Sequence, residues 1–260
     1  SDSPVLQQKV SKVYAEDKFP RSNILPEIDI YSRHNKIRIG YFSGDFREHP
    51  VSTLTAGLYE SHNRNQFEIH AFSFGPDTQD EMNTRIKSGV DYFHDVQSMS
   101  HKDIALLARS VEIDIAIDLG GYTVSGRTEI FAMILAPIQL SYIGFLGTMG
   151  APYYDYLLAD RITIPKGNQH YYTEKVAYLP TYQVNDSKEP PTDIFFTRKD
   201  IGLPETGFVF CCFNSVYKIT PDTFDSWMRI LQKVDDSVLV LNIDLESARE
   251  NLTNEASLRD

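Results

Sequence analysis

The chain has 260 residues, of which 42% are hydrophobic and 23% are charged, and its formal net charge is −11. A chain of this length can bury one large or two smaller hydrophobic cores. No apolar run approaches the roughly 20 residues that a membrane-spanning helix requires, and the acidic balance argues against a general binder of phosphate backbones. We therefore expect a globular protein with no nucleic acid and no membrane among its partners.

The only two cysteines, Cys211 and Cys212, are adjacent in a segment with the pattern of a buried strand. Adjacent cysteines suit neither a disulfide framework nor a spaced zinc site. A reducing compartment is the simpler interpretation, and no charged leader followed by an apolar run opens the chain. We predict a cytoplasmic location. Because the HEXXH and CxxC patterns are missing, we also predict that no metal is bound.

Residues 1–35 favour a helix followed by a polar connector. Leu6, Val10 and Val13 recur at helical spacing within residues 4–18, and two prolines follow in the connector.

Residues 36–182 carry strands that alternate with helices of about ten residues. The strands are predicted at 36–43, 67–74, 90–96, 113–119, 137–143 and 156–159, and the helices at 51–63, 80–88, 100–111 and 128–135. Ser100 is the expected N-cap of its helix. This alternation is typical of βαβ units and a parallel sheet, so we predict an open, Rossmann-like α/β domain.

Residues 183–206 are polar and proline-rich, which predicts a connector. Beyond them we predict a buried strand at 208–213, a helix at 221–234 with Thr220 as N-cap, a strand at 237–242 and a helix from 246. Two strands cannot bury both faces of a parallel sheet. Residues 207–260 are therefore predicted to begin a second Rossmann-like domain that is incomplete in this chain.

The loops after the strands are where chemistry is expected, because open parallel sheets bind ligands at the carboxyl ends of their strands. His49 lies in the loop after the first strand, directly before Pro50 and the next helix. A neutral imidazole can accept a proton from an attacking hydroxyl, and a helix N-terminus favours the neutral ring. The alternative interpretation is a surface histidine that only helps to start the helix.

Two further loops are rich in glycine. Gly120 and Gly121 follow the strand at 113–119, where paired glycines let the backbone approach a ligand or simply make the turn. Residues 144–150 (GFLGTMG) follow the strand at 137–143, and their N–H groups can line an anion site. Neither a Walker loop nor GxGxxG occurs, which argues against a P-loop or dinucleotide enzyme.

Lys218 lies in the strand-to-helix turn of the second unit. A lysine there can neutralise a diphosphate, with helix N–H groups completing the anion site, although a single lysine is more commonly a solvated loop residue. Asp45, Asp114 and Asp118 can each act as a base, but no pattern pairs them, so we interpret them first as turn or strand-end residues. The tyrosine-rich segment 153–156 is interpreted as packing at a domain seam.

In their order along the chain, these segments resemble the catalytic region of the O-GlcNAc transferase family, including SPINDLY and bacterial homologues. The matching strings are IGYFSGDF with HP at 39–50, GYT at 121–123 with Arg127 and Glu129, APIQ at 136–139, GFLGTMGA at 144–151, and FN with YKI at 213–219. Such an ordered set is far more specific than any one of its members.

The resemblance implies an α/β enzyme of the GT-B type, with two Rossmann-like domains, that moves GlcNAc from UDP-GlcNAc to Ser or Thr hydroxyls of proteins. It implies inversion of configuration, no metal, no other cofactor, and tetratricopeptide (TPR) repeats that end within residues 1–35. By the family's motifs, His49 lies beside the transferred sugar as base or positioning group. Lys218 contacts the diphosphate, and Tyr217 lines the same cleft as a second catalytic candidate.

From the two glycine-rich loops we also predict donor contacts, through Gly121, Thr123, Gly144, Gly147 and Thr148. Animal enzymes have a glutamine before Leu-Tyr-Lys in the last motif, whereas this chain has Ser215 and Val216, which leaves the donor sugar open. Because the rest of the second domain supplies most nucleotide contacts in the family, we expect this chain by itself to be inactive. The alternatives are a non-catalytic, TPR-linked peptide-binding module and a UDP-sugar epimerase of the same architecture.

Overall fold

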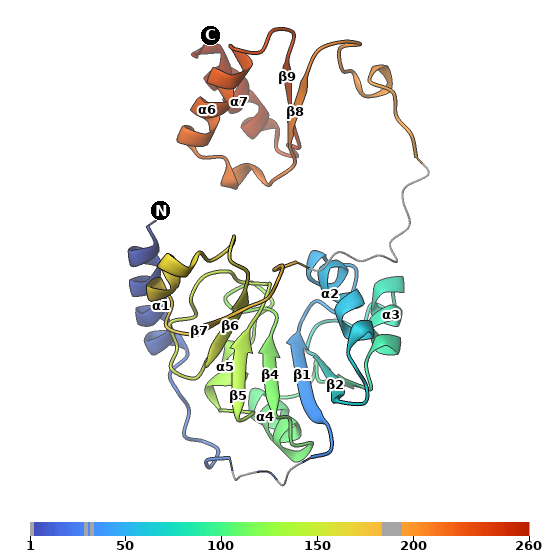
Figure 1. Ribbon diagram of the computed structural model, residues 1–260, viewed down its shortest axis with the longest axis vertical. Helices are drawn as coiled ribbons and strands as arrows, with labels where there is room; N and C mark the ends of the chain where they lie inside the picture. The colour runs from blue at the N-terminus through green and yellow to red at the C-terminus, as the bar shows by residue number, and fades with distance from the viewer. Residues whose placement is uncertain (1–2, 29–30, 32–33, 184–193, 260) are drawn as a thin grey trace. The chain divides into compact units, whose positions relative to one another are not determined.

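The computed structural model describes residues 3–28, 31, 34–183 and 194–259. The chain divides into two compact units, Ser1–Pro190 and Pro191–Asp260 (Figure 1). The division falls within the predicted connector 183–206, of which residues 184–193 lie outside the described residues. Each unit is described by itself below.

Within the described residues, unit 1 is built on a seven-stranded sheet in the order β3-β2-β1-β4-β5-β6-β7, and every neighbouring pair is parallel. The strands are β1 (Ile37–Ser43), β2 (Phe67–Ser73), β3 (Tyr92–Asp95), β4 (Ile115–Asp118), β5 (Ile138–Ser141), β6 (Tyr156–Ala159) and β7 (Lys175–Tyr178). In the centre of the sheet, Ile39 of β1 lies between Ile69 of β2 and Ile115 of β4. The predicted parallel α/β sheet is confirmed.

Helices cover both faces of this sheet (Figure 1). Helices α2 (Pro50–Ser61) and α3 (Glu81–Gly89) contribute Tyr59 and Ile86 to the core on one face. Helices α4 (His101–Ser110) and α5 (Thr128–Ala132) contribute Ile104 and Phe131 to the core on the other face. The predicted N-cap is confirmed, because the Ser100 hydroxyl accepts a hydrogen bond from Asp103 N at 3.2 Å.

Two predicted elements of unit 1 end earlier than their sequence pattern suggested because a residue with a left-handed backbone follows them. The helix predicted at 128–135 ends at Ala132, since Ile134 adopts a φ of +54°. The strand predicted to end at residue 143 ends at Ser141, since Ile143 adopts a φ of +62°. A left-handed conformation is unusual for β-branched residues, so the apolar pattern gave no sign of either break. Strand β7 was not predicted at all.

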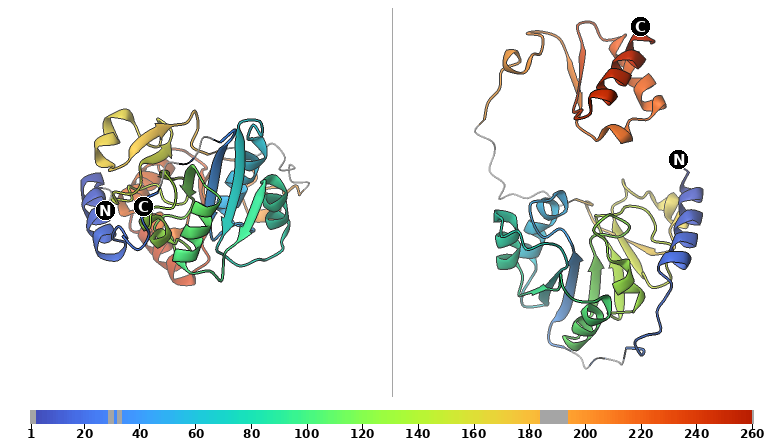
Figure 2. Two further views of the ribbon diagram at one scale, coloured as in Figure 1. Left: turned by 90° about the horizontal axis from the view of Figure 1, so that it is seen from below. Right: turned by 180° about the vertical axis from the view of Figure 1, so that it is seen from behind.

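Helix α1 (Pro4–Lys18) packs against the rest of unit 1 through small residues, with Ser11 and Ala15 buried. Gln8 Nε2 donates to the carbonyl oxygen of His170 at 3.1 Å, so α1 lies beside the 3₁₀ helix η1 (Lys166–Tyr171), as Figure 2 also shows. No helix in the described part of the chain is long and apolar enough to cross a membrane.

The tyrosine-rich segment packs in the interior of unit 1. Tyr154 stacks on Phe131 with ring centroids 5.4 Å apart, and Tyr153 Oη donates to the carbonyl oxygen of Phe19 at 2.9 Å. The packing role is confirmed, but these rings join the core beneath α5 and the connector that follows α1 rather than lining a domain seam.

Unit 2 contains a parallel strand pair, β8 (Val209–Cys212) and β9 (Val238–Leu241), with helices α6 (Pro221–Leu231) and α7 (Glu246–Ser257). Thr220 caps α6 as predicted, with its side chain accepting from Thr223 N at 3.4 Å. The prediction that the cysteine-bearing strand is buried is wrong, because Cys211 is exposed and Cys212 is partly exposed. A sheet of two strands with two helices has too little surface to enclose a strand.

Candidate active site

The carboxyl ends of β1, β4 and β5 bring three loops together, because β4 pairs with both of the other strands. We call residues 44–49, 119–127 and 142–150 the first, second and third loops. Their backbones touch: a Cβ atom on Gly44 would lie 3.0 Å from Ser125 Cβ, and one on Gly144 would collide with the Leu119 carbonyl oxygen. The glycines therefore permit close packing of the loops at this edge.

His49 lies at this edge as the N-cap residue of α2, with Pro50 in the first helical turn. Its Nδ1 accepts a hydrogen bond from Val51 N at 3.2 Å, and its side chain is 33% exposed. The simple interpretation of the sequence, a histidine that helps to start the helix, is thus realised. The partly exposed ring also remains available to a ligand.

The hydrogen bond to Val51 fixes which nitrogen of the neutral His49 ring carries the proton. Because Nδ1 accepts, the proton is on Nε2, which then acts as a hydrogen-bond donor. Accepting a proton at Nε2 requires the other tautomer, with a proton on Nδ1. Asp45 Oδ2 lies 3.8 Å from Nδ1 and is the nearby acceptor for that proton once the bond to Val51 is released.

Asp45 connects the first and second loops. Its carboxylate is buried at 5% exposure. Oδ2 accepts from Ser125 Oγ at 2.8 Å, and Oδ1 accepts from Arg47 at 3.3 Å. The Ser52 hydroxyl donates to the Asp45 carbonyl oxygen. Sequence reasoning treated Asp45 as a turn residue and missed Ser125, because their contact joins residues far apart in the chain.

Asp118 organises the second loop from below. Its Oδ1 accepts from Gly120 N at 2.9 Å and Gly121 N at 3.0 Å, and Oδ2 accepts from the Tyr154 hydroxyl. Burial raises the pKa of Asp118, and these hydrogen bonds oppose that shift. The interpretation of Asp118 as a turn residue is confirmed. Asp114, by contrast, lies at the opposite edge, where it accepts from Arg38 N at 2.8 Å.

The predicted donor-binding residues occupy different positions in these loops. Gly121 has a φ of +55° and lies against Phe145, and Thr123 Oγ1 donates to the Gly120 carbonyl oxygen at 2.9 Å. In the third loop, Gly147 lies against the Phe145 ring, and Thr148 is only 2% exposed. Donor contacts from these residues stay predictions.

The remaining two predicted site residues belong to unit 2. Tyr217 and Lys218 lie in the 3₁₀ helix η3 (Val216–Lys218), between β8 and α6. Tyr217 is 81% exposed, and Lys218 Nζ lies 5.9 Å from the centre of its ring. Both side chains are open to solvent in unit 2, and their predicted roles stay predictions.

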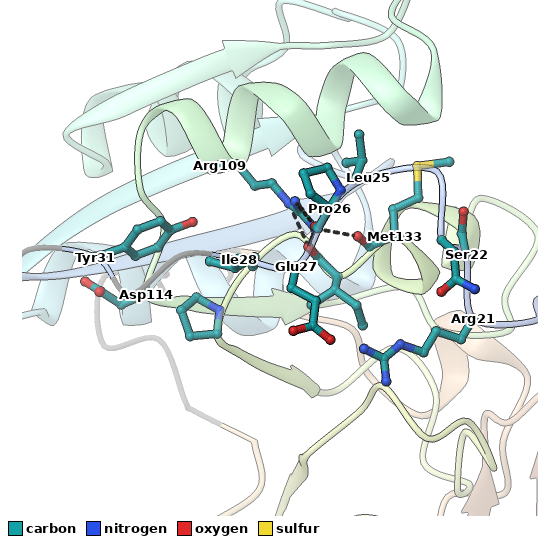
Figure 3. Close-up of a pocket in the computed structure, with 13 residues that line it drawn as sticks. Arg21, Ser22, Leu25, Pro26, Glu27, Ile28, Tyr31, Arg109, Asp114 and Met133 are labelled. Atoms are coloured by element: carbon teal, nitrogen blue, oxygen red, sulfur yellow. Dashed lines mark hydrogen bonds between the residues drawn. The ribbon is translucent and has the colours of Figure 1, made fainter.

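A cavity of about 500 Å³ lies at the other edge of the sheet, near the amino ends of β4 and β5, and is lined by Asp114 and Pro137 among others. One of its two arginines, Arg109, donates to the carbonyl oxygens of Pro26 at 2.6 Å and Met133 at 2.9 Å (Figure 3). This guanidinium fastens the connector after α1 to the end of α5. We interpret the cavity as structural, because ligands of open α/β sheets bind at the carboxyl ends.

Comparison with known proteins accounts for this arrangement. Residues 19–190 and 182–257 match the model of glycosyl transferase family 41. The chain belongs to glycosyl transferase family 41. The resemblance inferred from the loop motifs is thereby confirmed.

Similar proteins include the probable UDP-N-acetylglucosamine–peptide N-acetylglucosaminyltransferase SEC of Arabidopsis thaliana, 42% identical over 212 residues, 79% of this chain and 22% of SEC. A second relative is SPINDLY of rice, Oryza sativa subsp. japonica, which is also named as a probable UDP-N-acetylglucosamine–peptide N-acetylglucosaminyltransferase. It is 29% identical over 78% of this chain and 22% of its own length. The chain thus spans about a fifth of these relatives.

The structure is also similar to that of a Thermobaculum terrenum O-GlcNAc transferase mutant. The TM-score is 0.85 at 26% sequence identity, and the match covers 99% of this chain and 49% of that one. The predicted α/β fold of the GT-B type is confirmed by this likeness.

Proposed function

We propose that this family 41 chain serves a protein O-GlcNAc transferase, which moves GlcNAc from UDP-GlcNAc to Ser or Thr hydroxyls of protein or peptide acceptors. The reaction inverts the anomeric carbon and uses no metal or other cofactor. We place the protein in the cytoplasm, without nucleic-acid or membrane partners, with residues 1–35 as the end of a TPR region. The observation that carries the proposal is His49, partly exposed at the start of α2, among three loops whose motifs match the family in order.

In the proposed reaction, the acceptor oxygen bonds to the anomeric carbon while the bond from that carbon to the UDP oxygen breaks. The acceptor hydroxyl loses its proton, and negative charge develops on the leaving diphosphate. Lys218 would oppose that charge, and charge-assisted contacts of this kind lower the barrier when they strengthen in the transition state. In its resting tautomer, the Nε2–H of His49 donates to the sugar. In the tautomer that carries its proton on Nδ1, facing Asp45, Nε2 takes up the proton that the acceptor hydroxyl loses.

The names of the relatives support UDP-GlcNAc as donor and peptides as acceptors. Gly144 lies directly against the Leu119 carbonyl oxygen and Gly121 lies against the Phe145 side chain, so the two glycines let the second and third loops pack closely where the proposal places the sugar. This chain has Ser215 and Val216 where animal enzymes have glutamine and leucine before Tyr-Lys, so the donor sugar is the first property to measure.

The test uses full-length protein with UDP-GlcNAc and a Ser/Thr-containing peptide, and compares wild type with His49→Ala and Lys218→Ala. We expect UDP to bind wild type, and both substitutions to reduce transfer. The proposal fails if UDP does not bind and neither change affects transfer. Peptide binding without any turnover of the nucleotide sugar would instead indicate a binding module. Epimerisation of free UDP-GlcNAc without acceptor would indicate an epimerase.

A further inference from the structure

The third loop is tied to the segment before β7 by two buried polar side chains, Thr148 and Glu174, which are 2% and 4% exposed. Thr148 Oγ1 donates to Glu174 Oε2 at 2.7 Å. The other carboxylate oxygen, Oε1, accepts from Met149 N at 2.6 Å. One carboxylate therefore holds two consecutive residues of the loop.

The Thr148 hydroxyl has no hydrogen-bonding capacity left for a ligand. Besides donating to Glu174, Oγ1 accepts from Thr173 N at 3.1 Å and from Gly150 N at 3.2 Å. A hydroxyl offers one donor and two acceptor positions, and these contacts occupy all three. Thr173 Oγ1 also lies 3.0 Å away. These interior hydrogen bonds therefore argue against the predicted contact between the Thr148 side chain and the donor.

The position of the third loop in turn determines that of the second. Tyr122 Oη donates to the Met149 carbonyl oxygen at 2.6 Å. Phe145 packs directly on Gly121, where an added Cβ would lie 2.6 Å from Phe145 Cβ. A shift at residues 148–149 therefore moves both glycine-rich loops at the carboxyl edge of the sheet.

We propose that Thr148 and Glu174 are positioning residues for the donor sugar. They brace the third loop from the interior, and through Tyr122 and Phe145 they set the second loop as well. Neither side chain touches the ligand. The inference rests on the proposed function, because it takes these two loops as the sugar-binding surface.

The test compares Thr148→Val, Thr148→Ser and Glu174→Gln in full-length protein, with Arg109→Lys as a control at a partly buried site on the opposite edge of the sheet. Valine keeps the shape of threonine without the hydroxyl, serine keeps the hydroxyl, and glutamine places an N–H₂ donor against one of the two donors of the loop. The readouts are kcat and KM for UDP-GlcNAc and for the peptide. Hydrogen exchange of the Met149 and Gly150 amides and the melting temperature complete the set.

We expect Thr148→Val and Glu174→Gln to lower kcat/KM for UDP-GlcNAc on the order of 10- to 100-fold, as small misplacements of a binding surface can do. The KM of the peptide should change less, and Thr148→Ser should retain most of the activity. Exchange at Met149 and Gly150 should accelerate in the first two variants, but not in Arg109→Lys.

The positioning role of Thr148 and Glu174 is refuted if Thr148→Val keeps the wild-type kcat and KM for UDP-GlcNAc and changes only the melting temperature, as substitution of a purely structural residue would. It is also refuted if Thr148→Ser loses as much activity as Thr148→Val. If the wild type transfers nothing, the proposed function fails. Unchanged exchange at Met149 and Gly150 in Glu174→Gln would then refute the brace by itself, whereas accelerated exchange would support it as a structural link.

Discussion

At the scale of single residues, His49 has a structural role as a helix cap and a proposed role in transfer, and different substitutions can separate the two. Its Nδ1 caps α2, and the proposed reaction uses its Nε2. Asparagine is also a good N-cap, whereas alanine is a poor one, and the difference is typically about 1 kcal/mol of stability. A loss of stability and a loss of chemistry can therefore be measured independently at this one position.

We expect His49→Ala to lower the free energy of unfolding by about 1 kcal/mol and His49→Asn to leave it nearly unchanged. Both should reduce transfer by roughly 100-fold or more, because neither presents an imidazole. Urea unfolding and steady-state transfer rates measure the two effects. If His49→Asn transfers at the wild-type rate, the ring serves only to cap the helix.

A second histidine feature concerns pH rather than catalysis. His70 Nδ1 and His94 Nε2 are 3.0 Å apart on neighbouring strands β2 and β3. Burial, and then the neighbouring His70, lower the pKa of His94 from 6.5 to about 4. Burial also lowers the pKa of His70, with Glu68 opposing the shift. A hydrogen bond between two ring nitrogens requires one donor and one acceptor, so the contact cannot form with both rings protonated.

Because the pKa of His94 is lower in the folded protein, the unfolded chain takes up the proton first as the pH falls. The stabilising effect of the neutral ring is full above about pH 6.5 and is lost between about pH 6.5 and about pH 4. We expect His94→Gln, which cannot titrate, to flatten the fall of stability over that window. Urea unfolding at a series of pH values measures it, and an unchanged slope would contradict the assignment.

At the scale of elements, helix α1 and the third loop meet backbone to backbone. Gly150 adopts a φ of +66°, and an added Cβ would lie 2.5 Å from Lys12 N. Ser11, on the same helix, is buried against the loop. Here a glycine is required twice, for its conformation and for the space it leaves. A displacement of α1 will therefore also displace the third loop.

We expect Gly150→Ala to destabilise the chain by about 1–3 kcal/mol, because it adds left-handed strain and a collision with backbone atoms. It should also loosen α1, which protease cleavage after Lys18 would detect. Gly167→Ala is the matched control, since a Cβ there would meet nothing within 4 Å. Equal free energies of unfolding for the two variants would show that α1 can move away from residue 150 without loss of stability.

At the scale of the molecule, the two units differ in how much they bury. Unit 1 has cores on both faces of its sheet. In unit 2, only Phe224 and Met228 are buried among the described residues, and Phe213 is 67% exposed. Apolar burial is the main source of folding stability. Unit 2 should therefore be the weaker part of this chain.

The single tryptophan of the sequence, Trp227, lies in α6 of unit 2 and serves as a probe within that unit. In the 260-residue chain, we expect the fluorescence of Trp227 to change at a lower urea concentration than the far-UV circular dichroism, which unit 1 dominates. Non-coincident transitions are the mark of more than one cooperative unit. Coincident transitions would show that the two units unfold together.

Local patterns in the sequence were enough to place most elements of unit 1. The strands and helices from residue 36 to 159 follow from apolar periodicity, and Ser100 and Thr220 were recognised as caps because capping depends on residues three apart. The position of His49 after the first strand, and the ordered loop motifs that revealed the family, were likewise visible in the sequence.

Tertiary structure decided what depends on distant residues or on backbone conformation. The helix before Ile134 and the strand before Ile143 end because these residues adopt a positive φ, which their β-branched side chains do not predict. The contact of Asp45 with Ser125 and the brace of Thr148 on Glu174 join loops that only the pairing of parallel strands brings together. The sequence by itself determined the kind of protein and the edge of the sheet where its chemistry lies. Which polar side chains face the interior, and which remain for a ligand, follows only from packing.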